Sequence, residues 1–259
     1  MTVYHGYLYR WGTETSGLSK SGIQQQWDTQ FRSSGNFEFN AEYSASKNRH
    51  TWKNYTFHSP EPLSRFHKFQ KSELKHEGPF PYEVLVRVNE LTGTVVLLST
   101  GSGIVYHLVD RVLNRSLSPR LVRLQINILD LTNHLLGKGV DEYALTSIRA
   151  RVVASGRNLE KISFEGKDLA NASIVRQLTD LITPHYVGMR SRRDPVETEA
   201  IRLSNRGYIA ISFGESEEDR FEDSSAVQVP SRSTEPPEIH VSRAENCLHY
   251  ISENGFFWS

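Results

Sequence analysis

The sequence is poor in three features that would narrow its function, namely cysteine, long apolar runs and net charge. Its single cysteine, Cys247, permits no disulfide within the chain and no zinc site built from several cysteines, which favours a reducing compartment. No run approaches the length of about 20 apolar residues that a membrane helix needs, and the amino terminus lacks the pattern of a signal peptide. We therefore expect a cytoplasmic protein with no membrane partner.

Motifs for catalysis and cofactor binding are also missing. The stretch STGSGIV, residues 99–105, has two of the three glycines of a dinucleotide fingerprint and lacks the lysine of a Walker loop. Because it follows a predicted hairpin and not a parallel crossover unit, a plain strand-to-helix turn explains it better. The ten histidines include no His-Glu-x-x-His spacing. We expect no metal and no cofactor, and we favour a binding protein over an enzyme.

One nuclease-like pair of residues stands in FEGKD, residues 164–168. Glu165 and Lys167 follow the acid-x-lysine order of metal-dependent nucleases, in which the acid holds the ion and the lysine positions water. Such a site needs a further acid from a neighbouring strand, and the sequence offers no convincing one. We prefer to interpret these residues as the end of a hairpin that precedes a helix. A metal-dependent nuclease ranks third, behind the two functions given at the end of this section.

The composition is that of a folded globular protein, and its neutral charge hides an asymmetry. Apolar residues make up 37% and charged residues 23% of 259 residues, enough for one large domain or two small ones. From residue 215 to the end, ten acids face three arginines, a net charge of −7, so residues 1–214 carry +7. A basic body of this kind indicates an acidic partner or a contact with its own acidic segment.

Hydrophobic periodicity predicts an α+β fold in which antiparallel hairpins form mixed sheets with helices packed on one side. Residues 84–98 and 147–164 indicate hairpins, and each is followed by a helical pattern, at 104–115 and 174–182, which suggests two strand-strand-helix units. Further predictions are a strand at 3–10, a short helix at 23–31, a strand giving way to a helix that ends at Gly137 or Gly139, and a hairpin at 198–213.

The expected domain organisation has four parts. Residues 1–79 form an aromatic and basic segment or small lobe, within which 41–76 looks irregular, and residues 80–214 form the α+β core. Residues 215–238 form an acidic loop containing proline and serine, and residues 239–259 supply strands that dock on the core.

The positions of the basic residues are the basis of our functional hypothesis. Residues 41–76 hold seven bases and three acids, interleaved with aromatics that can stack on unpaired bases if they are exposed. The alternative is that these aromatics belong to the core. Farther along, Arg149 and Arg151 should share an open strand face with Lys161 across the hairpin, and the run RSRR, residues 190–193, either extends that surface or ends a strand. The candidate contacts are Lys47, Arg49, Trp52, Lys53, Arg149, Arg151, Arg190, Arg192 and Arg193.

The sequence therefore supports two alternative functions. The first is a non-enzymatic protein that binds DNA, RNA or another polyanion through its basic surface. The second is an assembly subunit whose basic body meets an acidic protein partner or the acidic tail of another copy.

Overall fold

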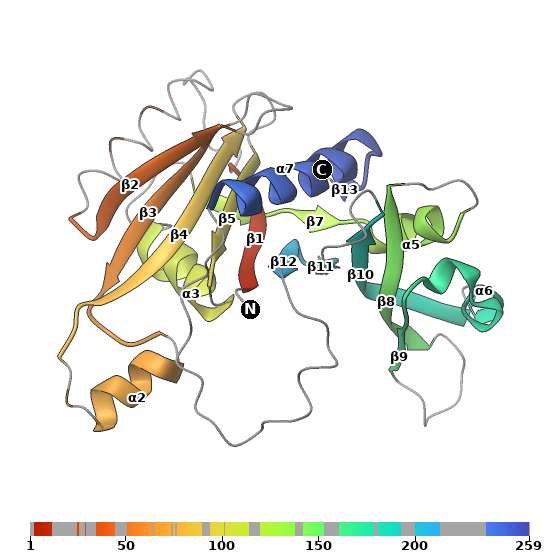
Figure 1. Ribbon diagram of the computed structural model, residues 1–259, viewed down its shortest axis with the longest axis horizontal. Coiled ribbons are helices and arrows are strands. Elements are labelled where there is room, and N and C mark those ends of the chain that lie inside the picture. Colours follow the sequence, from red (N-terminus) through yellow and green to blue (C-terminus); the bar gives the residue numbers. More distant parts are fainter. Residues whose placement is uncertain are drawn as a thin grey trace. The chain divides into compact units, whose positions relative to one another are not determined.

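The chain is described from a computed structural model, in which two compact units are distinguished (Figure 1). The structure describes residues 3–11, 25, 29, 35–44, 51–63, 65–73, 75, 77–89, 94–100, 102–113, 120–137, 142–152, 161–178, 181–192, 200–212 and 237–258. The amino-terminal unit comprises Val3–Leu124 and Gln228–Glu245, and the carboxy-terminal unit comprises Met1–Thr2, Gln125–Val227 and Asn246–Ser259.

The amino-terminal unit is built on antiparallel strands in the order β2-β3-β4-β5-β1, with β6 also paired to β1. Its strands are β1 (Val3–Trp11), β2 (Phe37–Ser44), β3 (Thr51–Ser59), β4 (Phe80–Asn89), β5 (Thr94–Ser99) and β6 (Leu121–Arg123). Its helices are α2 (Arg65–Glu73), α3 (Ser102–His107) and the π-helix η1 (Leu108–Leu113).

One face of this sheet holds the main apolar core of the unit. Alternate residues such as Tyr55, Val84 and Leu97 come together there, because successive side chains of a strand point to opposite faces. The helical segment α3–η1 covers this face with Val105 and Leu108, both fully buried in the same cluster.

The opposite face of the sheet carries a buried ion pair from helix α7 (Pro237–Glu253). Glu245, which is 1% exposed, lies with its Oε2 2.6 Å from Nε of Arg87, and its Oε1 accepts a hydrogen bond of 2.7 Å from Nη2. The same carboxylate accepts a hydrogen bond of 3.1 Å from the indole nitrogen of Trp52. Since Trp52 and Arg87 are cross-strand partners, one acid of α7 ties together β3 and β4.

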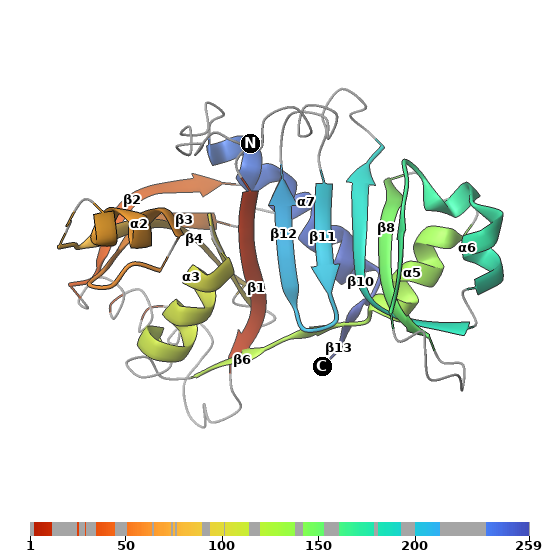
Figure 2. The ribbon, with the colours of Figure 1, turned by 90° about the horizontal axis from the view of Figure 1, so that it is seen from below.

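The carboxy-terminal unit has antiparallel strands in the order β12-β11-β10-β8-β9 (Figure 2). They are β8 (Tyr143–Val152), β9 (Ile162–Glu165), β10 (Ile182–Ser191), β11 (Ala200–Ser204) and β12 (Tyr208–Ser212), and β7 (Gln125–Ile126) pairs separately with β13 (Phe257–Trp258). The helices are α5 (Ile128–Leu136), the 3-10 turn η2 (Leu169–Asn171), α6 (Ser173–Leu178) and the end of α7.

The two faces of the carboxy-terminal sheet differ in chemistry. Ile148, Val187, Ile201 and Leu203 are completely buried on one face, and α5 contacts β8 and β10. The alternating residues of the same strands are charged, hydroxylic or small, and they include the exposed Arg149, Arg151 and Arg202 beside the half-buried Tyr186 and the buried Gly188. This second face is where the arginines predicted from the sequence lie.

Much of the local structure agrees with the periodicity of the sequence. The strand at 3–10, the hairpins formed by β4–β5, β8–β9 and β11–β12, and the helix after β5 are confirmed. The strand-to-helix transition after Leu121 is also confirmed, and α5 ends at Gly137, whose N–H donates to the carbonyl of His134. The fold is mixed α and β, but the strand pairs within both units are antiparallel and not mixed.

Residues 41–76 are not irregular, because they contain the second half of β2 and all of β3 and α2. Strand β3 has buried aromatic residues on both faces, with Trp52 on one and Tyr55 and Phe57 on the other. It therefore lacks the alternation of apolar and polar residues by which a strand is predicted from sequence. The helix expected at 174–182 is shorter, since Ile182 already begins β10. The short helix at 23–31 and the acidic loop fall outside the described residues, apart from Gln25 and Thr29, which are helical.

The carboxy-terminal segment is a helix where strands were expected over 239–259, with only β13 in strand form. Its buried residues Val241, Ala244, Leu248 and Ile251 follow helical spacing, which the small Ala244 and the adjacent charge obscure. Helices do not pack on one side only, because α3 and α7 lie on opposite faces of the amino-terminal sheet. The boundary between the units falls at Leu124–Gln125, inside the predicted 80–214 core. No helix within the described ranges is long and apolar enough to cross a membrane.

Candidate polyanion-binding face

Four exposed cations lie on the polar face of the carboxy-terminal sheet. Arg149 and Arg151 come from β8, Lys161 immediately precedes β9, and Arg202 lies on β11. Arg149 and Arg151 share a face because they are two residues apart in one strand, about 6.8 Å along it. We name this surface the cationic face and define it by Arg149, Arg151, Lys161, Tyr186 and Arg202.

Strand register arranges the cationic face in cross-strand rows. Ser163 pairs with Arg149, which pairs with Tyr186, which in turn pairs with Ser204. The next row runs Glu165, Ser147, Gly188, Arg202 and Ala210 across the same four strands and β12. The first row thus has a guanidinium and an aromatic ring at its centre, whereas the centre of the second is a serine and a glycine.

Tyr186 occupies the middle of this face and is half-buried. The guanidinium carbon of Arg149 lies 5.0 Å from the centre of its ring, a cation–π contact. Burial raises the pKa of the Tyr186 hydroxyl, and the positive charges of Arg202 and Arg149 oppose that rise. Two cations from different strands therefore act on one phenol.

His185 is the extra residue of a β-bulge, where the register of β10 against β8 shifts between Pro184 and Tyr186. Burial lowers the pKa of its imidazole, and the positive charges of Arg151, Lys161 and Arg149 lower it further. Among the residues that the structure describes, its buried Nδ1 has no hydrogen-bond partner. Arg151, Lys161 and Arg149 thus all act on the charge of one imidazole.

Gly188, in the middle of the second row, is buried and closely packed. A Cβ at this position would lie 2.3 Å from Oγ of Ser147 and 3.2 Å from Oγ1 of Thr146, so that no side chain fits without a shift. The hydroxyl of Ser147 therefore occupies the space that a side chain at position 188 would need.

The arginine run at the end of β10 divides into different environments. Arg190 alternates with Gly188 and Tyr186 and is half-buried, which places it on the cationic face by strand alternation. The Nη2 of Arg192 donates a 2.7 Å hydrogen bond to Asp168, the residue that caps η2, so this side chain ties the strand end to the helical turn. Arg193 lies outside the described residues.

Of the predicted contacts in the amino-terminal unit, the structure describes Trp52 and Lys53. Trp52 is fully buried and bonded to Glu245, and Tyr55 and Phe57 are core residues, so the core interpretation of these aromatics holds and Trp52 cannot stack on a base. Lys53 is half-buried. Lys47 and Arg49 fall outside the described part of the chain.

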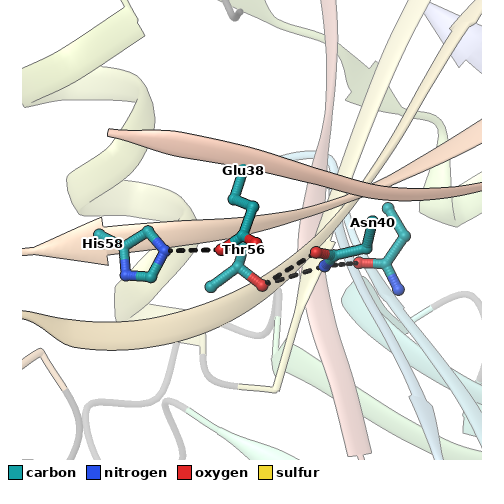
Figure 3. A network of polar contacts seen from close by, with 5 residues as sticks. Glu38, Asn40, Thr56 and His58 are labelled. Carbon is teal, nitrogen blue, oxygen red and sulfur yellow. Dashed lines mark hydrogen bonds and ion pairs between the residues drawn. The ribbon is translucent and has the colours of Figure 1, made fainter. Parts of the chain in front are cut away.

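A second polar cluster lies on the outer strands of the amino-terminal sheet (Figure 3). The amide nitrogen of Asn40 donates to Oδ1 of Asn54 at 3.3 Å and to Oγ1 of Thr56 at 3.0 Å. His58 Nε2 lies 3.3 Å from Oε2 of Glu38. These groups bond to one another across β2 and β3 and include neither lysine nor arginine, so we do not count them with the cationic face.

The cluster continues inward to Glu83, which accepts hydrogen bonds from Asn54 at 2.9 Å and from the hydroxyl of Tyr4 at 3.0 Å. Burial, followed by the charge of Glu83, raises the pKa of Tyr4 above its usual value. Tyr4 therefore remains a neutral donor, and the arrangement joins β1, β3 and β4.

The nuclease-like residues lie at the edge of the cationic face. Glu165 ends β9 and Lys167 follows it, and both are exposed. Within the described ranges, no three His, Cys, Asp or Glu residues come together as metal ligands would. A metal-dependent nuclease requires partner acids beside Glu165, and none of the described residues supplies them.

Tyr186, His185 and Arg202 are the residues of this site that sequence reasoning missed. Arg202 was detectable, since it alternates with Ile201 and Leu203 in the predicted hairpin. Tyr186 and His185 were not, because the predicted helix extends to Ile182, the first residue of β10, and its pattern gives no sign of the strand that follows. The chain matches no protein-family model, and no curated protein shows significant similarity to its sequence.

Proposed function

We propose that the protein binds nucleic acid or a similar polyanion through the cationic face, in a binding role without catalysis. The observation that carries this proposal is the convergence of Arg149, Arg151, Lys161 and Arg202 on one exposed sheet face from three separate chain segments. Glu165 is the acid that lies in the same rows.

The physical reason is the release of counterions. A polyanion holds a condensed layer of small cations, and every protein cation that replaces one of them adds a favourable entropy. A flat array of arginines also suits phosphate, since each guanidinium presents a planar fork of donors. Arg190 adds to the array, and Arg192 contributes less because Asp168 already neutralises it.

The test is binding of the full chain to fluorescently labelled DNA and RNA, followed by anisotropy at low and moderate salt. We expect binding that weakens steeply with salt. Undetectable affinity for single-stranded and double-stranded polynucleotides at low salt would overturn the proposal.

An assembly subunit is the second candidate, favoured by the net charge of −7 carried by residues 215–259. In this case the cationic face would receive an acidic protein partner or the acidic segment of another copy. Truncation at residue 214 is a poor test, because it removes Glu245 and leaves Arg87 buried without its counterion. Replacing the six acids at 215–223 by their amides keeps α7 intact. If light scattering finds the full chain and this variant equally monomeric over a range of concentrations, self-association is excluded.

A further inference from the structure

We infer that the polyanion is single-stranded nucleic acid, with an unpaired base stacked on the ring of Tyr186 at the centre of the cationic face. This inference rests on the proposed function and specifies its ligand. The cationic face has an aromatic ring, that of Tyr186, among its cations. Attraction between opposite charges alone would not require such a ring.

The neighbours of Tyr186 leave room for a base. On the β8 side the guanidinium of Arg149 lies over the ring at 5.0 Å, and on the β11 side the paired residue is the small Ser204. Along β10 the next residue on this face is Gly188, which has no side chain. The neighbours of the ring away from Arg149 are therefore small, and a base would stack on that side of the ring.

Cations lie on both sides of the ring of Tyr186. On one side, Arg149 and Arg151 are separated by about 6.8 Å along β8. Arg202 lies in the next row on the other side of Tyr186, paired with Gly188. A base on Tyr186 thus has cations on both sides for its flanking phosphates.

A duplex fits this surface less well. Duplex DNA hides the faces of its bases in the stack, and its grooves are read by an inserted helix or ribbon, whereas this face is a sheet surface. Sulfated polysaccharides would use the cations and have no aromatic face to stack. The ring therefore favours single strands over both of these polyanions.

The decisive experiment compares two single-stranded probes of equal length and charge. One is an oligothymidylate of about 12 nucleotides, and the other is the same backbone with abasic sites in place of the bases. Heparin serves as a polyanion without bases. Each is titrated against the wild-type full chain and against Tyr186→Leu and Tyr186→Phe, with thermal melts to confirm that both variants fold.

We expect the wild type to bind the oligothymidylate about 5- to 100-fold more tightly than the abasic probe, which is the range that stacking on an aromatic residue provides. Tyr186→Leu should remove this difference without changing the affinity for heparin, and Tyr186→Phe should retain it. Equal affinity of the wild type for the two probes would overturn the inference and leave the proposed function standing. A uniform loss of binding to all three probes in Tyr186→Leu would also overturn it, since the ring would then only position Arg149. Failure of the wild type to bind any probe at low salt would instead reject the proposed function itself.

Discussion

Removing two cations from the cationic face should lower the salt dependence of binding by a calculable amount. The perturbation is the double variant Arg149→Ala, Arg151→Ala, in which two exposed side chains of β8 are truncated. Both residues point away from the apolar core, so the sheet should remain folded. The matched control is Lys68→Ala, Lys71→Ala on α2, which removes the same charge from exposed positions of the other unit.

The magnitude follows from the four exposed cations of the face. For single strands each neutralised phosphate contributes about −0.7 to the slope of log K against log salt, so four contacts predict a slope of about −2.8. Between about 50 mM and 200 mM salt, that slope corresponds to about a 50-fold loss of affinity. With two contacts removed the slope becomes about −1.4 and the loss about sevenfold.

The assay is fluorescence anisotropy of a labelled oligonucleotide at several salt concentrations with the wild type and both double variants. The control pair should retain the slope and affinity of the wild type. If the control pair loses as much slope as the Arg149 and Arg151 variant, binding reflects overall charge or the amino-terminal unit. That result would refute the assignment of the site to the carboxy-terminal sheet.

Three further predictions concern His185, Gly188 and Glu245. Because the pKa of His185 is lowered in the folded protein, stability should fall as pH drops below about 6.5, where the unfolded chain takes up the proton more readily. A bound polyanion should raise that pKa, so that affinity increases as pH falls; an NMR titration that finds the imidazole unshifted by ligand would count against this. Gly188→Ala should cost about 1–3 kcal/mol of stability by overpacking against Ser147, and adding Ser147→Ala should recover part of it in denaturant unfolding. Glu245→Ala should cost about 3–5 kcal/mol by leaving Arg87 buried without its counterion, whereas the pair Glu245→Gln, Arg87→Met should recover most of this loss, since it removes both charges and keeps an acceptor for Trp52. Equal melting temperatures for Glu245→Ala and the wild type would show that the ion pair is not a stabilising element.

Sequence periodicity predicts elements that bury one face and expose the other. The hairpin of β8 and β9 is such a case, since Ile148 and Ala150 alternate with Arg149 and Arg151. That alternation was sufficient to predict an open face bearing both arginines and Lys161. The ring of Tyr186 could not be placed there, because the helical spacing of Leu178, Leu181 and Ile182 conceals the start of β10.

Elements buried on both faces are harder to predict, and residues 41–76 show the reason. The aromatics of β3 point to both sides of the sheet, so the segment looks like an exposed aromatic and basic surface. The tertiary contact that decides its role comes from Glu245, almost 200 residues later in the chain. Local sequence patterns cannot show that Trp52 donates a hydrogen bond to an acid on a distant helix. For this reason the sequence alone suggests that Trp52 is an exposed binding residue.

The most direct test is to determine which residues of the protein a bound polynucleotide contacts. NMR chemical-shift mapping of the full chain during titration with a single-stranded oligonucleotide supplies this at the level of single residues. The account predicts that the largest changes fall on Arg149, Arg151, Lys161, Tyr186 and Arg202, with Lys68 and Lys71 unaffected. Changes centred on α2, or on the polar cluster of β2 and β3, with the cationic face unperturbed, would contradict it.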